Sequence, residues 1–243
     1  MIYVENKKRK FERICADYPN AIIVDITSNS RDTIILDTPF NSREVPAKIL
    51  SPFYPHGNIP IPFSNGMTAS CVEAVWQGLK VFQEADVNIE TFKNDAMKDL
   101  KRTVRKYGAP LGHRKGVYGK ELLSYFDARM QIYLPTYKWV LDNVPEVHDV
   151  VMEIKAKAQQ SDIVLLDYNI NIDFRDITKP LSHAGLVKLY IEGHYPEFSK
   201  GYSPMTKEEL EEKRERLKLQ KKEIKKKAKQ APKIEERTLF DIN

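Results

Sequence analysis

Short runs of β-branched residues, each bounded by turn-forming residues, predict the strands of a small sheet. Residues 21–27 read Ala-Ile-Ile-Val-Asp-Ile-Thr between Pro-Asn and Ser-Asn-Ser, and residues 163–168 read Ile-Val-Leu-Leu-Asp-Tyr. Both runs are typical of buried strands, because branched side chains fit a pleated and covered surface. A further short strand is expected around residues 33–36, which places a small sheet early in the fold.

Apolar residues at intervals of three and four predict helices for most of the remaining chain. The expected helices cover residues 2–18, 70–84, 90–107, 118–143, 145–159 and 180–191. Pro135 predicts an interruption or restart in the fourth helix, and Ser182 is expected to cap the start of the last one. The predicted fold class is therefore α+β, a mainly helical domain around a small sheet with a charged C-terminal helical extension.

The composition changes sharply after Pro196, and this change predicts the domain organisation. Residues 207–229 predict a highly charged helix with apolar residues every seven positions, at Leu210, Leu217 and Ile224. Three such positions are too few for a coiled coil, so an exposed helix is expected. The predicted parts are a domain at 1–202, a charged helix and linker at 203–235, and a short apolar peptide at 236–243. That peptide docks either on another surface or back on the domain.

The net charge of +5 belongs to this tail. Residues 207–233 hold 12 Lys and Arg against 6 Asp and Glu, which leaves 27 basic and 28 acidic residues elsewhere from totals of 39 and 34. The domain is almost neutral, so any affinity for nucleic acid is confined to the tail. We expect residues 207–243 to contact a nucleic acid or a protein partner.

Other features of the composition exclude several classes of protein. No run of about 18 apolar residues is present, which excludes a membrane span. The charged residues at 5–10 stand where a signal peptide needs an apolar stretch, so a cytoplasmic location is expected. The two cysteines and five histidines show no spacing typical of a metal site, and neither a metal nor a cofactor is expected.

The strongest candidate for chemistry is the segment at 71–80, Cys-Val-Glu-Ala-Val-Trp-Gln-Gly-Leu-Lys. On a helix, Glu73 and Lys80 share one face with Trp76 and Gln77. A carboxylate and an ammonium on an inward face are costly to bury without a functional reason. The alternative is a solvated pair on a helix that docks through its apolar residues.

The preceding segment, residues 50–66, is dense in proline, glycine and aromatic residues. Proline forbids a helix here and discourages a central strand, which predicts a loop or an edge segment. Rigid loops that lead into a helix commonly form the wall of a pocket. The segment is therefore expected to contribute the wall of the candidate site.

Three further groups are weaker candidates, each with a structural alternative. Arg114 and Lys115 lie in a glycine-flanked basic loop at 111–116, which suits an anion such as phosphate but is also a common composition. Asp167 ends the second strand, where it either points into a site at the sheet edge or serves as a turn or cap. His183, at a helix start, either contacts a ligand or is packed and hydrogen-bonded locally.

The loop Leu-Ser-Pro-Phe-Tyr-Pro at 50–55 and the segment Val-Glu-Ala-Val-Trp-Gln-Gly-Leu-Lys at 72–80, with the later aspartate and helix, resemble the NADAR (NAD- and ADP-ribose-associated) family. Members of that family carry a Leu-Ser-Asn-Phe-Tyr-like loop and then a Val-Glu-His-x-Tyr-Gln-x-x-Lys-like helix. The likeness covers residues 48–192. The chain departs from the pattern at Pro52 and Ala74, and it lacks a late Trp-Gly signature.

The resemblance implies an N-glycosidase that cleaves the bond between a ribose C1 and a nitrogen, in a phosphoribosyl-type pyrimidine intermediate or in an ADP-ribosylated base. The positions that match the family's site residues are, in chain order, Glu73, Lys80, Tyr125, Arg129, and either Asp167 or Asp173.

The chemistry required agrees with these residue types. Breaking an N-glycosidic bond builds positive charge on C1 and the ring oxygen, so a carboxylate such as Glu73 stabilises the transition state or activates water. Lys80 offers a second route, attack on C1 to form an imine, which needs a deprotonated amine. The expected catalytic residues are Glu73, Lys80 and Asp167. The residues expected to bind the substrate, by stacking on its base or holding its phosphate, are Phe53, Tyr54, Trp76, Gln77, Arg114, Lys115, Tyr125, Arg129, Asp173 and His183.

The prediction from sequence is thus an N-glycosidase acting on a nucleotide-like small molecule or an ADP-ribosylated base. Two alternatives come from other classes of protein. One is a non-catalytic module that binds a nucleotide or ADP-ribose, and the other is an interaction protein whose tail is the active part.

Overall fold

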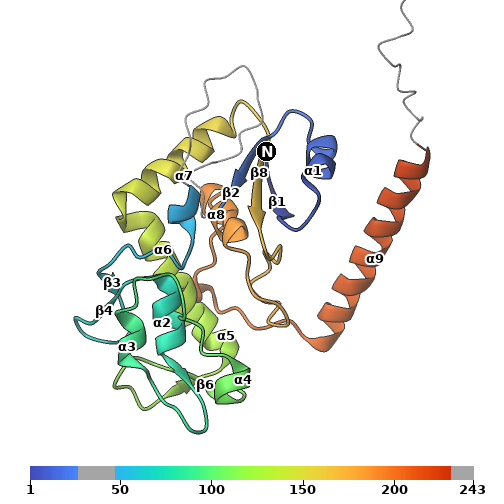
Figure 1. Ribbon diagram of the computed structural model, residues 1–243. Helices are drawn as coiled ribbons and strands as arrows, with labels where there is room; N and C mark the ends of the chain where they lie inside the picture. The colour runs from blue at the N-terminus through green and yellow to red at the C-terminus, as the bar shows by residue number, and fades with distance from the viewer. Residues whose placement is uncertain (27–46, 231–243) are drawn as a thin grey trace, which may run out of the picture. The chain divides into compact units, whose positions relative to one another are not determined.

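The computed structural model describes residues 1–26 and 47–230, and it divides the chain into two units, Met1–Pro204 and Met205–Asn243. In its described residues the first unit combines three small sheets with surrounding helices (Figure 1). The second unit contains the charged helix α9, Lys207–Gln230, at the predicted place. The predicted α+β fold class is confirmed. Across the described ranges, none of the helices combines the length and apolar character that crossing a membrane requires.

The first sheet is parallel and has the strand order β1-β8-β2. Ile163 of the central strand pairs with Ile2 on one side and with Ile22 on the other. All five residues of β8 are buried, as expected for a strand covered on both faces. The strands are β1 (Ile2–Asn6), β2 (Ile22–Asp25) and β8 (Ile163–Asp167), which confirms the two main strand predictions. The strand predicted around residues 33–36 lies outside the described residues.

The side chains of β8 alternate between two apolar clusters. Val164 and Leu166 join Ile14 of helix α1 (Phe11–Asp17) in the smaller cluster. Ile163 and Leu165 belong to the main core, which includes residues of the later helices. Alternate residues of a strand point to opposite faces, so the two clusters cover the two faces of the sheet. The later helices are α6 (Leu134–Asn143), α7 (Pro145–Lys157) and α8 (His183–Ile191).

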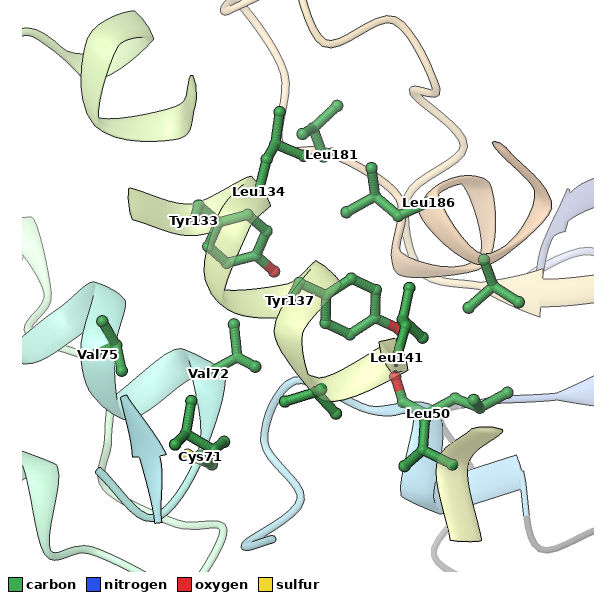
Figure 2. Close-up of a cluster of buried hydrophobic side chains, with 14 of the residues drawn as sticks. Leu50, Cys71, Val72, Val75, Tyr133, Leu134, Tyr137, Leu141, Leu181 and Leu186 are labelled. Carbon is green, nitrogen blue, oxygen red and sulfur yellow. Dashed lines mark hydrogen bonds between the residues drawn. The ribbon is translucent and has the colours of Figure 1, made fainter. Parts of the chain in front are cut away.

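Two tyrosines on consecutive turns join the helices of the main core. Figure 2 shows Tyr133 and Tyr137 between side chains from helix α2 (Val72–Gly78) and Leu186 of α8. The buried Tyr137 hydroxyl donates a hydrogen bond to the carbonyl oxygen of Leu50 at 2.6 Å, so this polar group is satisfied. The contact also fixes the short helix η1 (Ala47–Leu50), which leads into the proline-rich segment.

Two small antiparallel sheets complete the first unit. In one, Pro60 pairs with Thr68 on an edge strand, where the missing N–H of proline is tolerated. The prediction of a loop or edge at 50–66 is therefore confirmed. In the other, His113 pairs with both Lys80 and Leu123. The strands are β3 (Ile59–Pro60), β4 (Thr68–Ala69), β5 (Lys80–Val81), β6 (Gly112–Arg114) and β7 (Leu122–Leu123).

The prediction of one helix over residues 2–18 is wrong for its first half. Residues 2–6 form β1, and α1 begins only at Phe11. The side-chain oxygen of Asn6 accepts a hydrogen bond from the backbone N–H of Lys8 at 2.9 Å. Such local side-chain bonds compete with helix formation, so a turn separates the strand from the helix.

Helix α2 is shorter than the predicted helix at 70–84. It begins after Cys71, whose sulfur accepts a hydrogen bond from the N–H of Ala74 at 3.3 Å, and it ends at Gly78. A Cβ atom at Gly78 would lie 2.1 Å from the ring of Phe92, so only glycine lets helix α3 (Ile89–Phe92) pack this closely. Lys80 consequently lies on strand β5 rather than on a helix.

The predicted helix at 90–107 is also wrong. The chain forms two short helices here, α3 and α4 (Val104–Tyr107). Between them, the Asn94 side chain accepts a hydrogen bond from Ala96 N at 3.0 Å and donates one to Lys98 O at 2.9 Å. This asparagine turn replaces helical hydrogen bonds, an effect that apolar spacing does not reveal.

The predicted loop at 111–116 and the predicted helix start at 118 are replaced by the pair of strands β6 and β7. The Ser124 hydroxyl accepts a hydrogen bond from Asp127 N at 3.1 Å, which sets the start of helix α5 (Tyr125–Ala128). A widened turn, η2 (Arg129–Tyr133), then leads into α6. Pro135 stands in the first turn of α6, so the interruption predicted at proline takes the form of a wide turn just before it.

The remaining helices begin near their predicted positions. The predicted helices at 145–159 and 180–191 correspond to α7 and α8, and a short turn η3 (Phe198–Lys200) follows. Ser182 caps α8 as predicted, because its hydroxyl accepts a hydrogen bond from Gly185 N at 3.0 Å. Asp167 adds to this cap. Its Oδ2 accepts bonds from Ser182 Oγ at 2.9 Å, His183 N at 2.7 Å and Ala184 N at 3.3 Å.

We expect Asp167→Asn to lower the free energy of unfolding by about 2 kcal/mol, because the amide loses both the charge and one acceptor at a helix start. Urea denaturation followed by circular dichroism measures the difference. Asp149→Asn, an exposed change on α7, is the matched control and should leave stability unchanged. Equal stability of the two variants would contradict a capping role for Asp167.

Candidate functional site

A pocket of about 290 Å³ lies beside helix α2 and brings together most of the residues predicted from sequence. Helix α2, strand β5, α5, η2 and the start of α8 all contribute to its wall. The predicted residues that line it are Phe53, Glu73, Trp76, Gln77, Lys80, Tyr125, Arg129 and His183. The site is therefore assembled from segments far apart in the sequence.

The side-chain amide of Gln77 connects the two main candidates for chemistry. Its Nε2 donates a hydrogen bond to Glu73 Oε1 at 2.7 Å, and its Oε1 accepts one from Lys80 Nζ at 2.9 Å. The same oxygen accepts a bond from the backbone N–H of Arg102 at 3.0 Å. A backbone N–H donates only, so this contact fixes which end of the amide faces Lys80. Glu73 and Lys80 are thus held in one connected network.

Arg102 holds the turn from α2 to β5 in place. Its guanidinium donates to the carbonyl oxygens of Lys80 at 2.5 Å and Asp86 at 2.9 Å, and it lies over the rings of Phe82 and Tyr107. Only 7% of Arg102 is exposed. The buried cation therefore satisfies carbonyl groups of strand β5 and of the segment that follows it.

Burial is the main influence on the protonation of Lys80. It lowers the pKa of the amine, and the nearby Arg102 and Lys101 lower it further, whereas Glu73 acts in the opposite direction. Because the lysine is desolvated, a larger fraction of it is neutral at a given pH than for an exposed lysine. A neutral amine is a nucleophile, so this environment suits covalent chemistry.

Glu73 is nearly buried, with 7% of the residue exposed, and faces the same pocket. Its backbone N–H donates to the carbonyl oxygen of Pro52 at 2.9 Å. This bond joins the first turn of α2 to the proline-rich segment and brings the ring of Phe53 to the pocket wall. The rigid loop thus positions an aromatic ring beside the carboxylate.

Aromatic rings form much of the remaining wall. The Trp76 ring centroid lies 5.6 Å from that of Tyr125 and 5.4 Å from that of Tyr133, both edge to face. The His113 ring lies against the Trp76 ring, with the two ring centroids 3.7 Å apart. Burial and the nearby Lys80 lower the pKa of His113 to about 3, so this imidazole is neutral. A wall of this kind suits the flat face of a base or the apolar face of a sugar.

His183 and Asp167 lie at the junction of β8 and α8. The pKa of His183 is lowered, because the effect of burial exceeds the opposite effect of the carboxylates of Asp167 and Glu73. Its Nδ1 lies 3.8 Å from Asp167 Oδ2, and its ring reaches the pocket. Asp167 itself is 1% exposed and its carboxylate is engaged by the cap of α8. The geometry favours the capping alternative for Asp167.

Several predicted residues lie away from this pocket. The Tyr54 ring packs against that of His56, with the ring centroids 4.8 Å apart and the planes tilted by 45°. Arg114 forms an ion pair with Asp86 at 2.6 Å, and Lys115 forms one with Glu121 at 2.8 Å, because the strand pair turns them toward these carboxylates. Asp173 is not part of the pocket wall, and its Oδ1 accepts a bond from Arg175 N at 3.1 Å. The structure therefore does not place Arg114, Lys115, Tyr54 and Asp173 in the wall of this pocket.

Arg129 reaches the pocket but acts mainly as a support. Its guanidinium donates to the carbonyl oxygens of Phe174 at 2.9 Å, Asp176 at 3.0 Å and Lys179 at 2.9 Å. A further bond at 3.2 Å reaches the hydroxyl of Tyr125. These contacts hold the loop after β8 against η2 and orient one aromatic ring of the site.

The wall also contains residues that the sequence prediction missed. They are Lys101, Tyr133, Asn169, Pro180 and Leu181. The sequence contains a weak indication of Tyr133 as a site residue. On a helix it lies one turn after Arg129 and two turns after Tyr125, and therefore on the same face. The sequence contains no such indication for Lys101, because the turn between α3 and α4 determines that this lysine reaches the pocket. Within the described residues, no three or more His, Cys, Asp and Glu side chains are grouped as a metal site would require.

No curated protein and no solved structure matches the chain. One family model does match, over residues 6–187, and its description is a family of unknown function, DUF6939. The likeness to the NADAR family and the roles that it implies stay predictions, since this match assigns neither. The matched region spans well over half of the chain and contains the whole pocket, so the protein belongs to the DUF6939 family.

Proposed function

We propose that the protein is an N-glycosidase that cleaves the bond between a ribose C1 and a nitrogen in a nucleotide-like molecule or an ADP-ribosylated base. One observation carries the proposal. The carboxylate of Glu73 and the amine of Lys80, joined through Gln77, face one pocket whose walls are aromatic. Concave sites with apolar walls and a few convergent polar groups are where such ligands bind.

The carboxylate supplies a direct hydrolytic route. As the bond between C1 and the base nitrogen lengthens, positive charge develops on C1 and the ring oxygen, and the negative charge of Glu73 stabilises it. Water then adds its oxygen to C1 and passes a proton to Glu73, while the nitrogen keeps the bonding electrons and takes up a proton from solvent; Glu73 then releases its proton to solvent and is again a carboxylate. Gln77 donates to Glu73 Oε1, so Oε2 is not engaged by this amide and can accept a proton from the water.

The amine supplies a covalent route. Neutral Lys80 attacks C1, the base leaves with the bonding electrons and takes up a proton, and opening of the sugar ring gives an imine between Nζ and C1. Water then adds to C1 and releases both the sugar and the amine. The lowered pKa of Lys80 supports this route, because attack requires the unprotonated amine.

Two other expectations remain predictions. A cytoplasmic location and a nucleic-acid or protein partner for residues 207–243 are proposed from the charge pattern alone. The first unit contains the whole pocket, so the proposed reaction does not depend on either of them.

Turnover in matched variants tests the proposal. Purified protein is incubated with ADP-ribosylated nucleosides and with phosphoribosyl-aminopyrimidines, and released base is measured by chromatography. We expect Glu73→Gln to lower the rate by about 10²- to 10⁴-fold, the range for loss of a positioned acid or base. Lys80→Met separates the routes. A comparable loss, with a borohydride-trapped adduct on Lys80 in the wild type, supports the imine, whereas a small loss supports direct hydrolysis.

The exposed ion pair between Glu90 on α3 and Lys93, the residue after that helix, provides the controls. Glu90→Gln and Lys93→Met change the same chemical groups outside the pocket and should retain full turnover. Equal turnover in all variants would reject the roles of Glu73 and Lys80. Tight binding of these compounds without release of base would instead identify a non-catalytic binding module.

The protonation of Lys80 gives an independent prediction. In competitive acetylation followed by mass spectrometry, the labelling of Lys80 should reach half its maximum at a lower pH than that of Lys155, which is exposed on α7. Glu73→Gln should move the midpoint of Lys80 lower still, because the carboxylate favours the charged amine. A Lys80 midpoint at or above that of Lys155 would contradict the desolvated environment.

A further inference from the structure

A second hollow adjoins the pocket and is large, about 560 Å³. The two share the side chains of Phe53, Lys101, Asn169 and His183, so they form one continuous depression. We call the second part the lysine hollow, after the three lysines that line it, Lys48, Lys98 and Lys101. A ligand larger than a nucleoside has room to extend from the pocket into it.

The three lysines of this hollow come from two separate parts of the chain. Lys48 lies on η1, which the Tyr137 hydroxyl fixes through Leu50. Lys98 and Lys101 lie on the turn between α3 and α4, where Asn94 donates to the carbonyl oxygen of Lys98 at 2.9 Å. Lys101 stands at the junction, with its Nζ 5.5 Å from the centre of the Phe53 ring. The fold therefore brings these charges together by tertiary contacts.

Among the described residues, the lining of the hollow carries more positive than negative charge. Of the described residues, Asp167 contributes the one carboxylate to its wall, and that carboxylate is already engaged by Ser182, His183 and the N–H of Tyr168. Within the described ranges, none of the three lysines forms an ion pair with an acidic side chain. Like charges that converge without a counter-charge repel one another, and a bound anion removes that repulsion.

The neighbouring groups are consistent with this charge. Lys101 lowers the pKa of both Lys80 and His183, which places its ammonium within electrostatic range of the pocket. The Ser51 hydroxyl, also in the hollow, accepts a bond from Phe53 N at 3.3 Å and keeps its own proton to donate. Three ammonium groups and a hydroxyl match the several acceptor oxygens of a phosphate.

We propose that the lysine hollow binds the phosphate or pyrophosphate group of the substrate, so that the ribosyl compound cleaved in the pocket is a phosphorylated one. This inference rests on the proposed function for the identity of the sugar, but the anion site itself does not. It also replaces Arg114 and Lys115, whose ion pairs lie elsewhere, as the group that holds phosphate. Phe53 then separates the reacting carbon on one side from the phosphate on the other.

Binding of inorganic pyrophosphate by isothermal titration calorimetry tests the anion site without any turnover. The full chain should bind pyrophosphate, and added salt should weaken the binding. Lys48→Met with Lys98→Met removes two charges that line the hollow but not the pocket, and should weaken binding by about tenfold or more. The double change to arginine should retain binding. Lys93→Met with Lys155→Met, which removes the same charge from exposed positions, should bind as the wild type does.

Pyrophosphate binding that is absent from the wild type, or equal in the Lys48→Met, Lys98→Met variant and the wild type, would overturn the inference. Melting temperatures of all variants identify any that fail to fold, and the arginine variant then decides the result. Where turnover is found, ribosyl substrates with and without phosphate are compared. The methionine variant should lower kcat/KM for the phosphorylated substrate only.

The two proposals can fail separately. Pyrophosphate that binds through Lys48 and Lys98 while no ribosyl compound is cleaved would reject the N-glycosidase and keep the anion site. Equal turnover of phosphorylated and unphosphorylated substrates, unaffected by the two lysines, would reject the binding of the substrate's phosphate in the hollow and keep the N-glycosidase.

Discussion

The side-chain amide of Gln77 is the contact on which the candidate site depends. One end holds the carboxylate of Glu73, and the other accepts bonds from the amine of Lys80 and the backbone of Arg102. Because Arg102 also binds the carbonyl oxygen of Lys80 in the following strand, the amide joins the last turn of α2 to β5 and to the segment before α4. The acid and the amine are held together at the point where a helix becomes a strand.

The sequence predicted that Glu73 and Lys80 converge, because both were expected on one face of a helix. The structure places Glu73 on that helix and Lys80 on the strand that follows it. Glu73 and Gln77 do share a helical face, as their spacing of four requires. Lys80 lies beyond the helix, because Gly78 ends it against Phe92. The lysine still reaches the pocket since its flexible side chain bridges the short distance to Gln77 from the neighbouring strand.

Residues placed by long-range pairing were beyond prediction from local pattern. Arg114 and Lys115 read as free basic groups, yet strand pairing turns them toward Asp86 and Glu121. No local pattern singles out the lysines of the hollow, which the turn made by Asn94 and the position of η1 bring together. The cap at the start of α8 was predictable only in part. Ser182 was recognisable as a cap, whereas the part of Asp167 in the same cap needs the strand end to lie beside the helix start.

The parallel sheet has a consequence for how the chain acquires its structure. The central strand β8 pairs on both sides with strands from the beginning of the chain, and Ile163 is the partner of Ile2 and Ile22. Among the described residues, β8 is the strand with which β1 and β2 pair, so during synthesis this pairing waits until residue 167 has emerged from the ribosome. Contacts so distant in sequence form late and slow folding. The end of β8 also carries Asp167 and leads to Asn169, so the depression lacks this part of its wall until the strand has been synthesised.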